Sequence, residues 1–145
     1  MNLTGGEIDG VLSRHADIKH VFMGCVPCDR IPTRDRYPYA LVVNTDVSKG
    51  AGEHWVVIYA TSPTVVEYFD SLAKEPIPSI KEYLETFRTV IENPKPLQDK
   101  LSEVCGAYCM YFVAMRVQGR SLTEICNYLR SRKCSDDYVA SFFFQ

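Results

Sequence analysis

Apolar and polar positions alternate along the chain in two rhythms, one typical of helices and one typical of strands. Three sequences of the form Ser/Thr-x-x-Glu, a helix capping box, precede apolar residues at helical spacing: Thr4–Glu7, Ser79–Glu82 and Ser121–Glu124. We expect a helix after each of them. The second helix should carry its apolar stripe as far as Ile91 and end before Asn93-Pro94, since proline does not continue a helix.

Three β-branched and aromatic segments, 39–45, 54–60 and 64–70, predict buried strands. The last two are separated only by residues 61–63 and should form a hairpin. Pairing symmetric about Ser62 would place His54 opposite Asp70, with Cβ atoms ~4.5–5.5 Å apart on one face. A bulge would shift this register, and a plain surface His–Asp pair is the alternative.

The segments at either side of these strands carry weaker signals. Residues 21–32 contain Gly24, Pro27 and Pro32, which favour a loop that crosses the domain. The aromatic tail, 138–144, should dock on the core as a last strand or a short helix. The chain shows no repeat and no long linker, so we expect one domain over residues 1–145.

The stretch from Gln98 to Gly119 contains the most apolar helix that the sequence predicts. We expect Ser102 as its N-cap, Glu103 in its first turn and Gly119 as its end. Cys105 would then lie in the first turn, where free N–H groups and the helix dipole lower a thiol pKa. Cys105 is therefore a candidate nucleophile, and a buried, inert cysteine like Cys109 is the alternative.

Composition and charge limit the classes of protein that fit. The chain has 145 residues, 46% of them hydrophobic, and a net charge of -2, which argues against a surface devoted to nucleic acid. Its longest apolar run, Ala107–Met115, is about half the ~18–20 residues of a membrane span. We expect an intracellular protein with no membrane segment, no secretion signal and its six cysteines as thiols.

A thiol nucleophile needs a base, a group that orients the base, and donors for the developing oxyanion. The sequence offers Cys105 as nucleophile, His54 as base and Asp70 as the orienting carboxylate. Gln98 and the Cys105 backbone N–H would supply the oxyanion donors, with Asn44 as a weaker candidate. We expect Trp55 to pack beside His54.

These residues follow the order and spacing of a known active site. Gly52-Glu-His54-Trp55 is followed by an Asp at the end of the next strand and by Gln98 seven residues before Cys105-Gly106. The chain resembles the adenoviral maturation protease family, adenain, together with its relatives in virophages and Polinton/Maverick elements. The likeness runs from about Phe22 to Gly119 and includes a second cysteine, Cys109, four residues after the nucleophile.

The resemblance implies a papain-like α+β fold, with the nucleophile helix packed on a mixed, mainly antiparallel sheet flanked by helices. It implies a monomeric cysteine endopeptidase that cleaves viral capsid or core precursors after Gly in Leu-x-Gly-Gly or Leu-x-Gly-x-Gly sites. The virion, the host nucleus or a viral factory would be its location. Leu3-Thr4-Gly5-Gly6 has this form itself, so self-processing stands beside the capping box as a second interpretation.

Two departures from adenain bear on cofactors. Asp70 stands where adenain commonly has Glu, and no cysteine lies between Cys28 and Cys105 to bind an activating peptide through a disulfide. Peptide activation of that kind is therefore not expected, and the negative net charge argues against activation by DNA. The sequence itself calls for no cofactor and no metal.

Two other interpretations stay open. An enzyme of the same architecture could remove ubiquitin-like modifiers or transfer acetyl groups, although those enzymes usually have Asp-Cys-Gly where this chain has Val104-Cys105-Gly106. A zinc-binding structural module would belong to a different class. Its ligands would come from Cys25, Cys28, His15, His20, Cys126 and Cys134.

Overall fold

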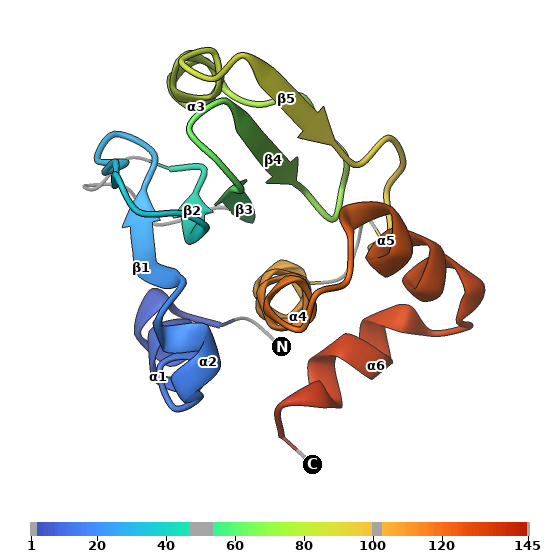
Figure 1. The fold of residues 1–145 in the computed structure, drawn as a ribbon. Helices are drawn as coiled ribbons and strands as arrows, with labels where there is room; N and C mark the ends of the chain where they lie inside the picture. Colours follow the sequence, from blue (N-terminus) through green and yellow to red (C-terminus); the bar gives the residue numbers. More distant parts are fainter. Residues whose placement is uncertain (1–2, 47–53, 100–102, 145) are drawn as a thin grey trace.

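A computed structural model describes residues 3–46, 54–99 and 103–144 of the chain. Within these ranges the strands form one mixed five-stranded sheet in the order β1-β2-β3-β4-β5. Helix α4 lies against one face of the sheet, with α1 and α2 near β1 and with α5 and α6 on the far side of α4 (Figure 1). Helix α3 covers the opposite face, where Ile80 and Leu84 join the apolar side chains of the sheet.

The sheet has antiparallel pairs at its centre and a parallel pair at each edge. The central pairs are β2–β3 and β3–β4, and the outer pairs are β1–β2 and β4–β5. The prediction of a mixed sheet is confirmed, as are the three predicted strands. The bounds are β1 Phe22–Pro27, β2 Tyr39–Asn44, β3 Trp55–Ala60, β4 Val65–Phe69 and β5 Thr89–Glu92.

The prediction of a loop over residues 21–32 is wrong, because β1 runs through it. Gly24 has a φ of 129°, and the pairing with β2 shifts between Phe22 and Gly24. Pro27 is the last residue of the strand. An edge strand tolerates such residues because only one of its sides needs ladder hydrogen bonds.

The helices are α1 Gly5–Leu12, α2 Ala16–Lys19, α3 Pro78–Leu84, α4 Cys105–Val117, α5 Leu122–Ser131 and α6 Ser135–Phe142. Two of the three predicted capping boxes are present with both hydrogen bonds, at Thr4–Glu7 and Ser121–Glu124. The aromatic tail belongs to α6, whose Tyr138 and Phe142 pack edge-on against Tyr111 of α4. No helix in the described ranges is both long enough and apolar enough to cross a membrane.

The second predicted capping box and helix are wrong in extent. Helix α3 starts with Pro78 in its first turn, which places Ser79 inside the helix. The N-cap residue is Ile77, and it makes no side-chain capping hydrogen bond. The helix ends at Leu84, and the residues expected in its last turns form β5. Their β-branched side chains suit the parallel pairing that β4 offers them.

Helix α4 is the centre of the larger core cluster. Every residue from Cys105 to Met115 is buried, as expected for a helix that is apolar on all sides. It ends as predicted, with Gln118 as C-cap and Gly119 at a φ of +95°. Its start differs: Val104 is the N-cap, Glu103 lies before the helix, and the predicted cap Ser102 lies outside the described residues.

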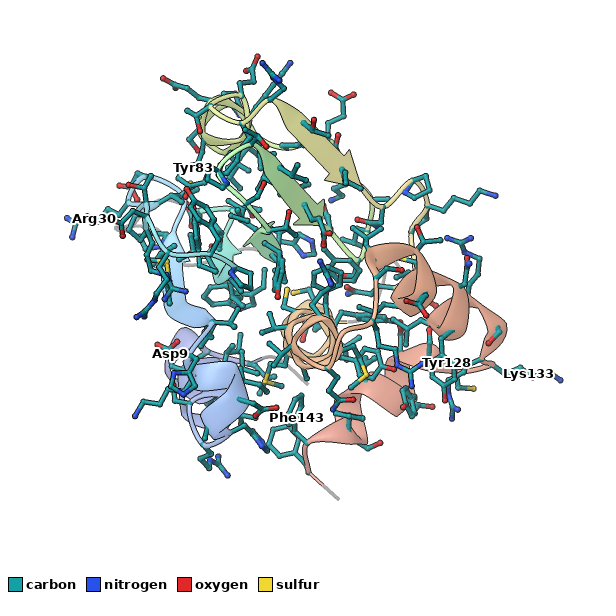
Figure 2. All side chains as sticks on the ribbon, viewed as in Figure 1. Asp9, Arg30, Tyr83, Tyr128, Lys133 and Phe143 are labelled. Atoms are coloured by element: carbon teal, nitrogen blue, oxygen red, sulfur yellow. The ribbon has the colours of Figure 1, made fainter. Side chains whose placement is uncertain are left out.

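Side chains fill the space between α4 and the sheet (Figure 2). One ion pair fixes the far end of the helix to β4. Arg116 donates from Nε to Glu67 Oε1 at 2.8 Å and from a terminal nitrogen to Glu67 Oε2 at 3.0 Å. The guanidinium also lies 4.6 Å from the centre of the Tyr59 ring. This pair and stacking contact keep α4 in register with the sheet.

We predict that Arg116→Ala lowers the free energy of unfolding by about 3 kcal/mol, because it leaves the buried Glu67 carboxylate without its partner. Urea unfolding followed by circular dichroism measures the change. The matched control is Arg88→Ala, which removes an exposed arginine and should change the free energy by less than about 0.5 kcal/mol. Equal values for the two variants would contradict the prediction.

Candidate active site

Three of the four predicted site residues lie at the ends of elements that meet at one end of the sheet. His54 comes directly before β3, Asp70 comes directly after β4, and Cys105 is the first residue of α4. Helix α4 packs on β3, and a Cβ atom added at Gly106 would lie 3.5 Å from Trp55 Cδ1, so the first turn of the helix lies beside the start of that strand. The structure therefore brings together side chains that are far apart in the sequence.

His54 and Asp70 form a short hydrogen bond. The distance from His54 Nε2 to Asp70 Oδ1 is 2.6 Å, and the two side chains are 15% and 4% exposed. The carboxylate also accepts from two main-chain N–H groups, Leu72 at 2.9 Å and Lys74 at 3.3 Å. These donors hold both carboxylate oxygens, so Asp70 presents a fixed acceptor to the imidazole.

The register of the hairpin differs from the predicted one. Ala60 pairs with Val66 and Ile58 with Tyr68, a shift of two residues from pairing symmetric about Ser62. The turn is wider than predicted because Thr61 and Ser62 both donate to the carbonyl of Val65. A shift of two keeps every side chain on its face, so His54 still meets Asp70, along a diagonal rather than directly opposite.

The His54 ring links the carboxylate to the thiol. Because Nε2 contacts Asp70, Nδ1 is the ring nitrogen left for the hydrogen bond with Cys105. Burial alone would lower the His54 pKa, but the hydrogen bonds and negative charges of Asp70 and Cys105 raise it to about 9. The imidazole therefore stays protonated through neutral pH.

The Cys105 thiol is shifted in the direction that a nucleophile needs. Burial acts to raise its pKa, and this is outweighed by the His54 hydrogen bond and charge and by main-chain hydrogen bonds from Trp55 and Gly106, so the pKa is lowered. Cys109, one turn further along α4, shows the contrast: burial raises its pKa well above the usual value. The neighbouring imidazole and the main-chain donors therefore lower the pKa of the thiol at the start of the helix, and the thiol one turn further on lacks them.

Gln98 lies at the same end of the sheet, held by Ser71. The main-chain N–H groups of Leu97 and Gln98 donate to the Ser71 carbonyl at 2.8 and 3.0 Å. The Ser71 hydroxyl donates to Gln98 Oε1 at 2.5 Å, and Gln98 is 6% exposed. The weaker candidate, Asn44, instead accepts from the Asp46 N–H at 2.8 Å through its own side-chain oxygen.

Sequence reasoning missed two residues that support the site, Ser71 and Asn93. Asn93 is buried and clamps the main chain of Asp70, accepting from its N–H at 3.0 Å and donating to its carbonyl at 2.8 Å. The sequence shows Asn93-Pro94 only as a helix stop. Both contacts join segments more than twenty residues apart, so no local pattern could reveal them.

Trp55 also contacts the N-terminal segment of the chain. Its indole N–H donates to the carbonyl of Leu3 at 3.0 Å. A Cβ atom added at Gly106 would lie 3.3 Å from Leu3 Cβ and 3.2 Å from Ile8 Cδ1, closer than ordinary contact. Glycine at position 106 therefore lets the N-terminal segment pack on the first turn of the nucleophile helix.

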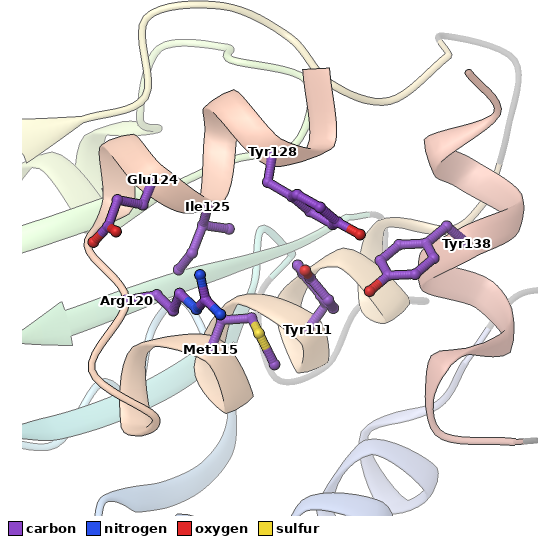
Figure 3. Close-up of a pocket in the computed structure, with 7 residues that line it drawn as sticks. All are labelled: Tyr111, Met115, Arg120, Glu124, Ile125, Tyr128 and Tyr138. Atoms are coloured by element: carbon purple, nitrogen blue, oxygen red, sulfur yellow. The ribbon is translucent and has the colours of Figure 1, made fainter. Parts of the chain in front are cut away.

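The described residues hold no group of three or more His, Cys, Asp or Glu side chains that could bind a metal. Cys25 contacts Asp9, and burial raises its pKa strongly, while Cys28 donates weakly to the Thr45 carbonyl at 3.6 Å. The ligands of the zinc alternative are thus not brought together. A separate pocket of about 200 Å³ lies between α4, α5 and α6 and is lined by none of the four candidate residues (Figure 3).

Comparison with known proteins places this geometry in context. No family model matches the chain. The SUMO-1 cysteine protease S273R of African swine fever virus (isolate Pig/Kenya/KEN-50/1950) is 25% identical over 118 residues, covering 72% of this chain and 41% of that protein. This chain therefore matches less than half the length of the relative.

Solved structures agree on the fold. The crystal structure of the ASFV pS273R protease matches with a TM-score of 0.66 at 20% identity, and its selenomethionine form with 0.63 at 21%, each over 98% of this chain and 66% of theirs. The C-terminal Ulp1 protease domain in complex with Smt3, the yeast ortholog of SUMO, matches with 0.52 at 12%, over 98% and 76%. The chain has a cysteine protease fold.

This protease fold confirms the predicted α+β, papain-like class, with α4 as its central helix. The likeness to pS273R and Ulp1 supports the protease fold in general. The narrower resemblance to adenain stays a prediction, as do the roles of His54, Asp70, Gln98 and Cys105.

We predict that Cys105 reacts with iodoacetamide at pH 7 at least about tenfold faster in the wild-type protein than in His54→Ala. His54 with a pKa of about 9 is protonated at pH 7 and stabilises the thiolate, whereas burial without the imidazolium raises the thiol pKa. Mass spectrometry of the labelled peptides measures both rates. Exposed Cys134 is the internal reference and should react alike in both proteins; equal Cys105 rates would refute the ion pair.

We also predict that the N-terminus survives long incubation of the purified protein. Gly5 and Gly6 lie in the first turn of α1, where Thr4 and Glu7 complete the capping box, and Leu3 is buried against Trp55. A protease needs an extended segment, which this helix start does not offer. Intact-mass measurement checks the outcome; a chain that begins at Glu7 only when Cys105 is intact would establish self-processing instead.

Proposed function

We propose that this chain is a cysteine endopeptidase with Cys105 as nucleophile, His54 as base and Asp70 as the group that orients His54. One observation carries the proposal: the first residue of a buried helix is a cysteine of lowered pKa, hydrogen bonded to a histidine whose other ring nitrogen is 2.6 Å from a buried carboxylate. Nucleophile, base and orienting acid in this order are the arrangement of thiol proteases.

The mechanism follows from these groups. The Cys105 thiolate attacks a peptide carbonyl, and the negative charge moves to the carbonyl oxygen, where the Gln98 amide and the Cys105 N–H donate. When the tetrahedral intermediate collapses, the C–N bond breaks and protonated His54 gives its proton to the leaving amine. Water, deprotonated by His54, then attacks the thioester and releases the acid product and the free thiol.

The substrates we propose are viral precursor proteins, cleaved after Gly in Leu-x-Gly-Gly or Leu-x-Gly-x-Gly sites. The support is the adenain-like order of His54, Asp70, Gln98 and Cys105-Gly106 together with a curated relative that comes from a virus. The virion, the host nucleus or a viral factory would be the place of action. We propose one monomeric protease domain that needs no cofactor; a net charge of -2 favours no DNA partner.

A second candidate function is the processing of ubiquitin-like modifiers. It is favoured by the matched viral protein, named as a SUMO-1 cysteine protease, and by the Ulp1 domain, solved in complex with Smt3. An acetyltransferase of the same architecture is the remaining alternative in this class. The endopeptidase, the modifier protease and the acetyltransferase would all use the Cys105 thiolate. The substrate that reacts therefore distinguishes the three functions.

The deciding experiment offers the purified protein three substrates: a Leu-x-Gly-Gly capsid-type peptide, a SUMO-like fusion and acetyl-CoA with a peptide amine. We expect cleavage of the capsid-type peptide after Gly, measured by mass spectrometry, with no transfer of acetyl groups. Preferential cleavage of the fusion would favour the modifier protease, and acetyl transfer without cleavage would refute the endopeptidase.

Variants test the proposed roles. Cys105→Ala should abolish cleavage, whereas the matched control Cys109→Ala, in the same buried helix, should keep most of it. Gln98→Ala should lower kcat by about 10²–10³-fold, the usual effect of losing one oxyanion donor. Cleavage by Cys105→Ala at the wild-type rate would remove Cys105 from the mechanism.

A further inference from the structure

We infer that Ser71 is a positioning residue for the oxyanion donor: its hydroxyl binds the Gln98 amide oxygen and so fixes the direction of the amide nitrogen, the proposed donor. The inference rests on the proposed function, in which Gln98 donates to the oxyanion. Ser71 touches neither the thiol nor the substrate in this scheme. It acts through Gln98 alone.

Ser71 contacts Gln98 at both the main chain and the side chain. Its carbonyl accepts from the N–H groups of Leu97 and Gln98, which places the Gln98 backbone, and its hydroxyl donates to Gln98 Oε1 at 2.5 Å. Ser71 is 1% exposed and Gln98 is 6% exposed, so water has little access to compete for the hydroxyl–amide bond. One serine thereby fixes the position and the direction of the amide.

The direction matters because a side-chain amide has two faces of opposite chemistry. Its oxygen accepts hydrogen bonds and its nitrogen donates them, and a half-turn about the last bond exchanges the two. Of these two amide atoms, only the nitrogen can donate a hydrogen bond to an oxyanion. With Oε1 bound to the Ser71 hydroxyl, the nitrogen lies on the opposite side of the amide, and a half-turn would cost the bond to a buried oxygen.

The serine itself is held firmly. It follows Asp70, whose main chain is clamped by Asn93 through two hydrogen bonds of 3.0 and 2.8 Å. The turn closes where the Ala73 N–H donates to the Asp70 carbonyl at 2.8 Å, with Ala73 at a φ of 50°. One turn therefore carries both the acid that orients His54 and the hydroxyl that orients Gln98.

The test separates chemistry that needs an oxyanion donor from chemistry that does not. Peptide cleavage builds charge on a carbonyl oxygen, whereas alkylation of a thiolate by iodoacetamide displaces iodide and builds none. We expect Ser71→Ala to lower kcat for peptide cleavage about tenfold with KM within about twofold, because one buried hydrogen bond is lost. The alkylation rate of Cys105 and its pH dependence should match wild type.

Three controls sharpen the result. Ser71→Thr keeps the hydroxyl and should recover most of kcat, and Ser131→Ala, which removes an exposed hydroxyl, should match wild type. In a Gln98→Ala background, Ser71→Ala should have almost no further effect on kcat, because its partner is already gone. A thermal melt on each variant confirms that it is folded.

Each contrary outcome overturns the inference in its own way. Loss of cleavage and alkylation together would make Ser71 a purely structural residue, and so would an equal loss in the Gln98→Ala background. Wild-type kcat in Ser71→Ala would show that the hydroxyl does not orient the amide. If the wild-type protein cleaves no peptide and no fusion, the proposed function fails and this inference fails with it, a result that needs no Ser71 variant.

Discussion

The hydrogen bond between His54 Nε2 and Asp70 Oδ1 is the interaction on which the rest of the site depends. By occupying one ring nitrogen it leaves the other for Cys105, and it keeps the imidazole protonated through neutral pH. The pKa of the thiol is then lowered although the helix start is buried. A buried carboxylate is costly unless it is fully hydrogen bonded, and the N–H groups of Leu72 and Lys74 meet that need.

Helix α4 shows that burial alone does not decide how a thiol ionises. Cys105 and Cys109 lie one turn apart on the same helix, and both are buried. The pKa of Cys109 is raised well above its usual value, whereas that of Cys105 is lowered by the protonated His54 and by the N–H groups of Trp55 and Gly106. The charge of His54 and the N–H donors at the helix start therefore outweigh desolvation at Cys105. Both are missing at Cys109, one turn away.

Residue patterns predicted the centre of the fold and failed at its edges. Strands β2 to β4 have strong β-branched and aromatic patterns, and the first and third capping boxes are local, so both kinds of element could be read directly. The edge strands β1 and β5 form because a neighbouring strand offers them a partner, and β5 is exposed throughout. Their sequences, with Gly24 and Pro27 in one and a helix-like stripe in the other, do not carry that information.

The four candidate residues could be named from the sequence because their order along the chain is itself a pattern, and their roles stay a prediction. The error in hairpin register did not separate His54 from Asp70, since strand side chains repeat every two residues. Ser71 and Asn93 could not be found in this way, because each acts across a long sequence separation. The same holds for the contact of Leu3 with Gly106, which joins the first described residue to the nucleophile's neighbour. Because a ribosome synthesises the chain from its N-terminus, Leu3 can contact Gly106 only after about a hundred more residues have been added. The thiol therefore acquires its full surroundings only after α4 has emerged, and a nascent chain carries an ordinary cysteine.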